Sequence, residues 1–156
     1  MYKNQIKFLF LVLLLIACTN HKFKPKERQE NSKYEELKSK MRITYNDDKY
    51  AETLQYIDQL LQMDSTDGEV FFKKGYCESG LDNSEESIEA YSKAAQLNYK
   101  KVDALFNIGA NLLLKCDSLA EIYFKQCLAI NPNYEKAKIQ LQVIKDHPSK
   151  YYNNCK

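Results

Sequence analysis

The stretch TLQYIDQLLQMD, residues 53–64, decides the fold because the chain repeats it. It returns as SIEAYSKAAQLN at residues 87–98 and as AEIYFKQCLAIN at residues 120–131, about 34 residues apart, and Gly75 returns as Gly109. Each copy has apolar residues at helical spacing, and a unit of this length buries its apolar face only against neighbouring copies. The repeat therefore predicts stacked helices that act as a binding scaffold rather than an enzyme.

The helical pattern covers nearly all of the chain from residue 32 onward, and no stretch reads as a strand. The chain contains only four glycines and three prolines, which fits helices joined by short turns. Ser32 and Ser118 each precede a glutamate by three residues, so we expect them to cap the first and sixth helices, and we expect residues 65–68 to cap the third. The helices expected from these signals cover residues 33–46, 50–62, 69–80, 84–96, 101–115, 118–130 and 134–146.

The repeated unit resembles the tetratricopeptide repeat (TPR) over about residues 33–146. The residues that carry the resemblance are FFKKG at 71–75 with SIEAYSKA at 87–94, and LFNIG at 105–109 with Ala120, Phe124, Cys127, Asn131 and Pro132. The resemblance implies an all-α fold, an α-solenoid of about three TPR-like helix pairs closed by a C-terminal capping helix. It also implies close helix crossings at Gly75 and Gly109, with Tyr91 and Phe124 as bulky wedges between repeats.

The first and last helices depart from this pattern. Met41 stands where the family has glycine, and Thr53 occupies an alanine position, so the first repeat is degenerate. Terminal repeats are expected to be atypical because one side lacks a neighbour. The seventh helix looks like a solvating cap, with a polar side that faces solvent and an apolar stripe. The stripe is formed by Ala137, Ile139, Leu141, Val143 and Ile144.

The N-terminus has the pattern of a targeting segment. Lys3 and Lys7 precede the unbroken apolar run 8–16, which is shorter than the ~20 residues that span a bilayer. The run ends in Leu-Ile-Ala-Cys at 15–18, which resembles the lipobox of bacterial lipoproteins. That resemblance implies cleavage before Cys18 and lipidation of its thiol; a plain secretory signal with an incidental cysteine is the alternative.

These features divide the chain into four parts: a signal peptide at 1–17, the lipidated cysteine and a flexible tether at 18–31, the helical domain at 32–146 and a tail at 147–156. The tether is polar and carries lysines that either touch anionic headgroups or are simply solvated. Thr19 after the cysteine and the lack of an acidic run favour a lipid-anchored protein of the bacterial cell envelope that faces the periplasm from the outer membrane. Loss of 1–17 leaves 21 basic and 21 acidic residues, which disfavours nucleic-acid binding.

No set of residues has the spacing of a catalytic, cofactor or metal site. The chain has two histidines, His21 and His147, and no CxxC pair. We therefore expect no enzyme activity, no metal and no cofactor. Cys77 and Cys127 occupy small packing positions and are expected to be buried thiols. Cys116 and Cys155 are the candidates for a disulfide in an oxidising envelope, although other pairings stay open.

The TPR resemblance places function on a concave groove lined by the first helix of each pair. Reading positions 34 residues apart gives a surface that is basic at its N-terminal end and aromatic or aliphatic farther on. Exposed aromatic residues in a groove favour a bound helix or extended peptide, the alternative being that they pack on the seventh helix. The candidate groove residues are Lys38, Arg42, Tyr45, Phe72, Tyr76, Phe106 and Leu113.

The leading interpretation is a membrane-tethered protein–protein interaction scaffold, an adaptor or assembly factor whose protein or peptide partner is not identified by the sequence. A second interpretation is a structural protein that self-associates or whose groove is filled by its own C-terminus. A third is a thiol-based redox protein, against which the missing CxxC pair counts.

Overall fold

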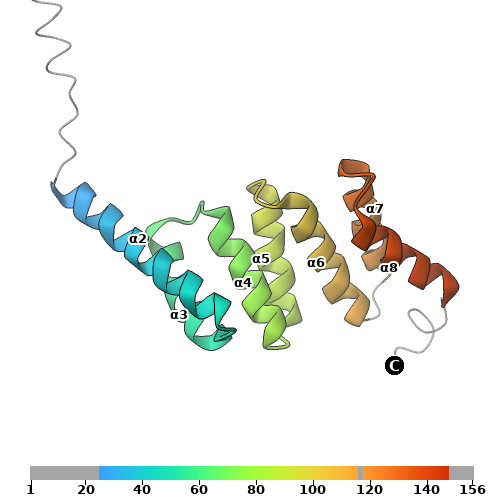
Figure 1. The fold of residues 1–156 in the computed structure, drawn as a ribbon, viewed down its shortest axis with the longest axis horizontal. Coiled ribbons are helices and arrows are strands. Elements are labelled where there is room, and N and C mark those ends of the chain that lie inside the picture. The colour runs from blue at the N-terminus through green and yellow to red at the C-terminus, as the bar shows by residue number, and fades with distance from the viewer. Residues whose placement is uncertain (1–24, 116–117, 148–156) are drawn as a thin grey trace, which may run out of the picture. The chain divides into compact units, whose positions relative to one another are not determined.

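The computed structural model of the chain describes residues 25–115 and 118–147. Over these residues the protein is all-helical, with seven helices that hold 82% of them and no strand (Figure 1). The predicted all-α class is therefore confirmed for the described part of the chain. The helices are α2 (Pro25–Asn46), α3 (Tyr50–Met63), α4 (Gly68–Gly80), α5 (Ser84–Gln96), α6 (Lys101–Leu114), α7 (Leu119–Ile130) and α8 (Glu135–Asp146).

The start of α2 differs most from the sequence-based expectation. The helix begins at Pro25 and not near residue 33, so residues 25–31, which we expected to belong to the flexible tether, are helical. Proline suits the first helical position because its fixed φ is helical and its missing N–H needs no partner there. Ser32 consequently lies inside the helix and the cap predicted there is wrong. The expected signal peptide and Cys18 lie outside the described residues.

The two other predicted caps have opposite outcomes. Asp67 accepts hydrogen bonds from the backbone N–H groups of Glu69 and Val70, at 2.8 and 3.3 Å, so the cap expected within residues 65–68 is confirmed. Ser118 has helical backbone angles and makes no side-chain hydrogen bond to the first turn of α7, so the cap predicted at that serine is wrong. An N-cap residue needs a non-helical backbone to aim its oxygen at the free N–H groups.

The chain divides into two units, residues 1–33 and 34–156, of which the first contributes only the start of α2 to the described part. In the second unit, α3 packs on α4, and each helix from α4 to α7 packs on the one that follows it. The core has two clusters. The smaller joins α2, α3 and the start of α4 through Leu37, Met41, Ile57, Leu60 and Val70, and the larger extends from Tyr91 to Ile144.

The same close contact occurs in the α4–α5 and α6–α7 pairs. A Cβ atom built on Gly75 would lie 2.8 Å from the ring of Tyr91, and one on Gly109 would lie 2.7 Å from the ring of Phe124. Both rings are buried, and both distances are shorter than real Cβ contacts. The close crossings predicted at the two glycines are therefore confirmed, and the fold is repeat-like in its contacts.

The α2–α3 pair solves the same packing problem with different residues. Met41 occupies the position equivalent to Gly75, and Ile57 the position equivalent to Tyr91; both side chains are fully buried. In the α2–α3 pair, a methionine and an isoleucine stand at the two positions that a glycine and an aromatic residue occupy in the other pairs. Because cores tolerate exchanges that conserve total volume, this explains how the first pair lacks the glycine.

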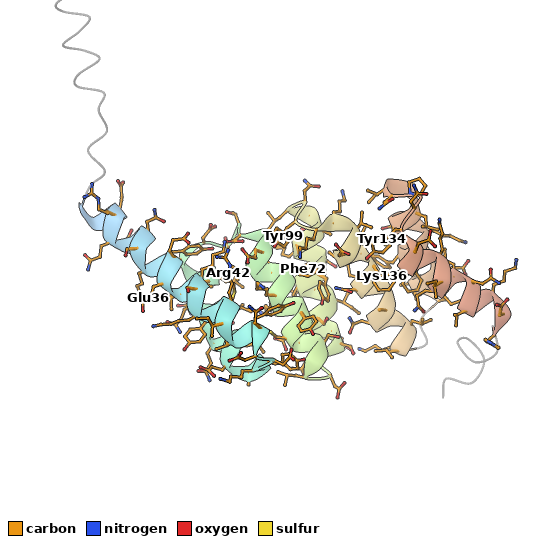
Figure 2. The ribbon with its side chains drawn as sticks, viewed as in Figure 1. Glu36, Arg42, Phe72, Tyr99, Tyr134 and Lys136 are labelled. Carbon is orange, nitrogen blue, oxygen red and sulfur yellow. The ribbon has the colours of Figure 1, made fainter. Side chains whose placement is uncertain are left out.

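A second repeated contact links each pair to the next helix. The ring of Phe72 packs against those of Tyr91 and Tyr99, at centroid distances of 5.2 and 5.9 Å. Figure 2 shows Phe72 beside Tyr99. The ring of Phe106 lies between those of Phe124 and Tyr134, at 5.5 and 5.7 Å. A lysine also lies over each phenylalanine ring. Lys100 Nζ is 5.4 Å from the centroid of Phe72, and Lys136 Nζ is 5.9 Å from the centroid of Phe106.

Helix α8 has one buried side and one polar side. Ala137 and Ile144 are buried against α7, whereas Ile139 is 57% exposed and does not belong to the apolar stripe predicted for it. On α8, the positions that correspond to the α7-facing residues of α6 are polar and exposed. They are Lys138, Gln142 and Lys145, which correspond to Leu105, Gly109 and Leu112. The face that would receive a further helix is thus polar.

Candidate functional site

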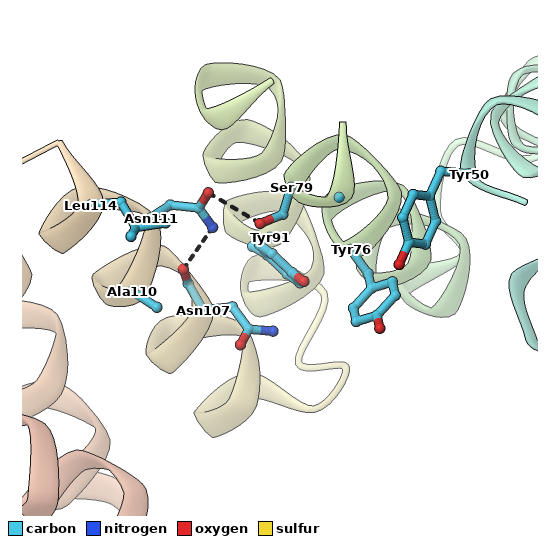
Figure 3. A pocket seen from close by; sticks show the side chains of 9 residues that line it. Tyr50, Tyr76, Ser79, Tyr91, Asn107, Ala110, Asn111 and Leu114 are labelled. Carbon is cyan, nitrogen blue, oxygen red and sulfur yellow. Dashed lines mark hydrogen bonds between the residues drawn. The ribbon is translucent and has the colours of Figure 1, made fainter. Parts of the chain in front are cut away.

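A pocket of about 280 Å³ opens between α4 and α6. Four of its residues follow one face of α6 at helical spacing, three come from the end of α4, and Tyr50 of α3 and Tyr91 of α5 complete it (Figure 3). The lining is a mixture of aromatic rings, amides and hydroxyls. The lining residues are Tyr50, Tyr76, Ser79, Gly80, Tyr91, Asn107, Ala110, Asn111 and Leu114.

Asn111 holds the wall of this pocket in place. It is 4% exposed, donates to Ser87 Oγ at 3.3 Å and to the Asn107 carbonyl at 2.9 Å, and accepts from Ser79 Oγ at 3.3 Å. Ser87 in turn donates to the Gly75 carbonyl at 2.8 Å. A buried amide is costly unless its hydrogen bonds are made, so this network fixes α6 against both α4 and α5.

Tyr50 and Tyr76 line the pocket, and Tyr45 of α2 packs beside Tyr76. The rings of Tyr45 and Tyr50 lie 5.0 and 5.8 Å from the ring of Tyr76, which is itself 39% exposed. Burial raises the pKa of Tyr45 to about 12, so this group is a neutral phenol at physiological pH. Lys73 Nζ lies 3.5 Å from the centroid of the Tyr45 ring, a distance at which a cation and a ring attract each other.

The two predicted groove cations, Lys38 and Arg42, lie on α2 and pair with carboxylates at the start of α4. Lys38 binds Asp67 and stands 3.2 Å from Glu69, and Arg42 donates to both Glu69 oxygens at 2.9 and 2.6 Å. Tyr34 also donates to Asp67, at 2.8 Å. These contacts hold α2 against α4.

The pKa values of the two carboxylates reflect this pairing. Burial alone would raise the pKa of Asp67, but hydrogen bonds from Lys38 and Tyr34 outweigh it and hold that pKa below its usual value. Hydrogen bonds from Arg42 likewise hold the pKa of Glu69 down. Both carboxylates therefore stay charged at neutral pH.

The seven residues predicted to line a groove fall into three groups by their contacts. Tyr76 lines the pocket and Tyr45 packs beside it, whereas Lys38 and Arg42 belong to the paired cluster. The remaining three are partly buried and pack against the larger core cluster, namely Phe72, Phe106 and Leu113. Phe106 packs on Tyr134 at the start of α8, which is the packing alternative left open by the sequence.

Of the nine residues that line the pocket, only Tyr76 was among the seven candidate groove residues. Tyr50 and Tyr91 come from α3 and α5, which were assigned to packing only. Asn107, Asn111 and Leu114 lie on α6 but outside the columns chosen for the groove. Asn111 did give a signal, since a polar residue stands there in the buried stripe of a helix and such a residue needs hydrogen-bond partners.

The described cysteines are buried. Cys77 and Cys127 are fully buried free thiols, as predicted, and burial raises the pKa of each to about 11. The candidate disulfide partners Cys116 and Cys155 lie outside the described residues. Within the described ranges, no group of three or more histidine, cysteine, aspartate or glutamate side chains could hold a metal ion.

Comparison with known proteins adds no relative to this picture. A scan against protein-family models finds no match for the chain, and a search of curated proteins finds none. Among the described helices, none is both long enough and apolar enough to cross a membrane. The arrangement of side chains around the pocket is therefore the main guide to function.

Proposed function

We propose that this chain is a lipid-anchored scaffold of the bacterial cell envelope that binds a segment of a protein partner in the pocket between α4 and α6. The observation that carries the proposal is the pocket itself. Its walls are fixed by the buried Asn111 network, and its lining offers rings, amides and hydroxyls to a ligand. Preorganised sites bind more tightly because little side-chain freedom is lost on binding.

The repeated contacts support a finer proposal for the fold. The Gly75–Tyr91 and Gly109–Phe124 crossings, together with the two aromatic triplets that link each pair to the next helix, are what stacked TPR-like pairs would require. Three pairs followed by α8 as a cap would form a short solenoid. In such an array, residues on the first helices of successive pairs would face a ligand together, and Tyr76 and Asn107 both line the pocket.

The membrane part of the proposal rests on the N-terminal sequence. The lipobox-like residues 15–18 would leave Cys18 as the first residue of the mature chain, joined to a lipid. Two acyl chains on one residue suffice for stable anchoring, so no spanning helix is required. The anchor would keep the pocket close to the envelope surface, where its partner would be met at high effective concentration.

Two other functions have less support. Leu114 at the pocket edge is 79% exposed, so the same surface could join two copies of the chain, and light scattering would reveal such a dimer. A thiol-based redox role would need an accessible thiolate, whereas Cys77 and Cys127 are buried with raised pKa values.

The proposal is tested by filling the pocket without altering the core. Ala110 is a half-buried lining residue, so Ala110→Trp should place an indole in the pocket and abolish co-purification of envelope proteins with the chain. Ala129→Trp is the matched control, because Ala129 is exposed on α7 and lies outside the pocket. Partners retained by the Ala110→Trp variant, with its helical circular dichroism unchanged, would refute binding in this pocket.

A further inference from the structure

Lys73 on α4 is a partly buried cation without a carboxylate partner. Its Nζ lies 3.5 Å from the centroid of the Tyr45 ring, and among the described residues no carboxylate comes within ion-pair distance of it. The other cations of this surface differ, since Lys38 and Arg42 both pair with the carboxylates at the start of α4. The face of the Tyr45 ring offsets part of the cost of desolvating this ammonium, and a carboxylate would offset more of it.

Charges of both signs act on Lys73. Burial lowers the pKa of Lys73, the carboxylate of Glu69 raises it, and the charges of Lys100 and Arg42 lower it. Lys100 also lacks an ion pair among the described residues and stands over the ring of Phe72 at 5.4 Å. The one nearby carboxylate, Glu69, is already engaged by two hydrogen bonds from Arg42. The site therefore has spare positive charge and no spare negative charge.

This positive site is continuous with the pocket. The Tyr45 ring beneath Lys73 packs on the ring of Tyr76, at a centroid distance of 5.0 Å, and Tyr76 lines the pocket. Lys73 and Tyr76 are also one turn apart on the same helix. A ligand that reaches into the pocket past Tyr76 therefore passes Lys73.

We infer that the partner segment bound by this surface is extended and acidic: a carboxylate side chain of the partner pairs with Lys73 while a bulky side chain nearby enters the pocket. This inference rests on the proposed function and specifies its ligand. The ammonium lies 3.5 Å from the centroid of the Tyr45 ring, and that ring lies 5.0 Å from the ring of Tyr76 at the pocket. Two or three residues of extended chain, at about 3.3 Å each, cover this path.

A single carboxylate fits this site better than a phosphate. Glu69 lies close to Lys73 and would repel a second negative charge. The guanidinium of Arg42, the group best suited to a phosphate, is already bound by both oxygens of Glu69. One partly buried ammonium matches one carboxylate in charge.

The test selects ligands without assuming their sequence. A displayed library of random dodecapeptides is panned on the full chain, purified in mild detergent, and on its Lys73→Gln and Lys74→Gln variants. Lys74 is the matched control, because it is the next residue on α4 but lies against α5 beside Glu86 and Glu89. Wild type and Lys74→Gln should enrich peptides with Asp or Glu two or three residues from a bulky side chain, and Lys73→Gln should lose the acidic preference.

The best peptide is then synthesised with both ends blocked and measured by fluorescence anisotropy. Its Glu→Gln version should bind wild type about 10- to 100-fold more weakly, the cost of a charge-assisted hydrogen bond, and should bind Lys73→Gln no more weakly than the parent peptide does. A phosphoserine in place of the glutamate should not strengthen binding. The peptide-side change keeps the test valid if Lys73→Gln fails to fold.

Four outcomes contradict the inference. Enriched peptides without acidic residues, or an unchanged affinity for the Glu→Gln peptide, would remove the role of Lys73 while leaving pocket binding intact. A phosphoserine peptide that binds tenfold more tightly would replace the carboxylate with a phosphate. Failure to enrich any peptide on the wild-type chain would overturn both this inference and the proposed function.

Discussion

The repeat contacts make a quantitative prediction about the α6–α7 pair. In Gly109→Met, the new Cβ would start 2.7 Å from the ring of Phe124, which is fully buried and cannot move aside. Overpacking of a core costs about 1–3 kcal/mol, with larger values for a longer side chain, against a gain of about 0.8 kcal/mol in helix propensity. We therefore expect the free energy of unfolding to fall by about 2 kcal/mol or more. Phe124→Ile alone should cost about 1–3 kcal/mol through the cavity that it leaves.

The double variant Gly109→Met/Phe124→Ile should be more stable than the sum of the single changes predicts. It reproduces the Met41–Ile57 pairing that the α2–α3 pair already uses, in which both side chains are fully buried. We expect a favourable coupling of about 2 kcal/mol, near the upper end of values for residues in contact. Urea unfolding followed by circular dichroism at 222 nm measures all four proteins. Additive effects, or a Gly109→Met variant as stable as wild type, would show that the pairs are not equivalent.

Three further predictions concern the anchor, the charge cluster and the thiols. Cys18→Ser should move the chain from the detergent phase to the aqueous phase in a phase-partition assay; unchanged partitioning with the signal cleaved would refute the lipid anchor. Because the folded-state pKa of Asp67 is lowered, its contribution to stability is present above the unfolded value of about 4 and is lost as the pH falls through the folded value. Wild type should therefore lose stability below about pH 4, and Asp67→Asn should be less stable at pH 7 with a smaller acid loss; equal pH profiles would contradict the Lys38–Asp67 pairing. Cys77 and Cys127 should react with a thiol reagent at pH 8 only after unfolding, because they are buried with pKa values of about 11, and rapid reaction of both in the native chain would contradict that burial.

Helix positions were largely predictable from the sequence because the repeat supplied several independent signals. Apolar spacing, glycine and turn residues agreed for α3 to α8, and the expected bounds differ from the observed ones by at most one residue. The start of α2 was missed because the polar segment 18–31 was assigned to a flexible tether, although a proline such as Pro25 suits the first turn of a helix. Ser118 failed as a cap because a capping pattern states nothing about backbone angles.

The candidate site was less predictable because a surface depends on pairings between distant segments. The sequence shows that Lys38, Arg42 and Lys73 are basic. It does not show that carboxylates at the start of α4 pair with the first two and leave Lys73 without an ion pair among the described residues. It likewise places Phe72 on a helix face without showing that Tyr99 covers its ring. Such contacts arise from tertiary packing, which local patterns do not encode.

The central claim is that the pocket between α4 and α6 receives a protein partner. The most direct measurement places a photo-crosslinking amino acid at position 110 in the pocket or at the exposed position 129 on α7, and irradiates intact cells. The account predicts that the chain labelled at position 110 forms a crosslink to one discrete protein. This product should be absent from cells kept in the dark and from cells labelled at position 129. Crosslinks from position 129 alone, or equal products from both positions, would contradict it.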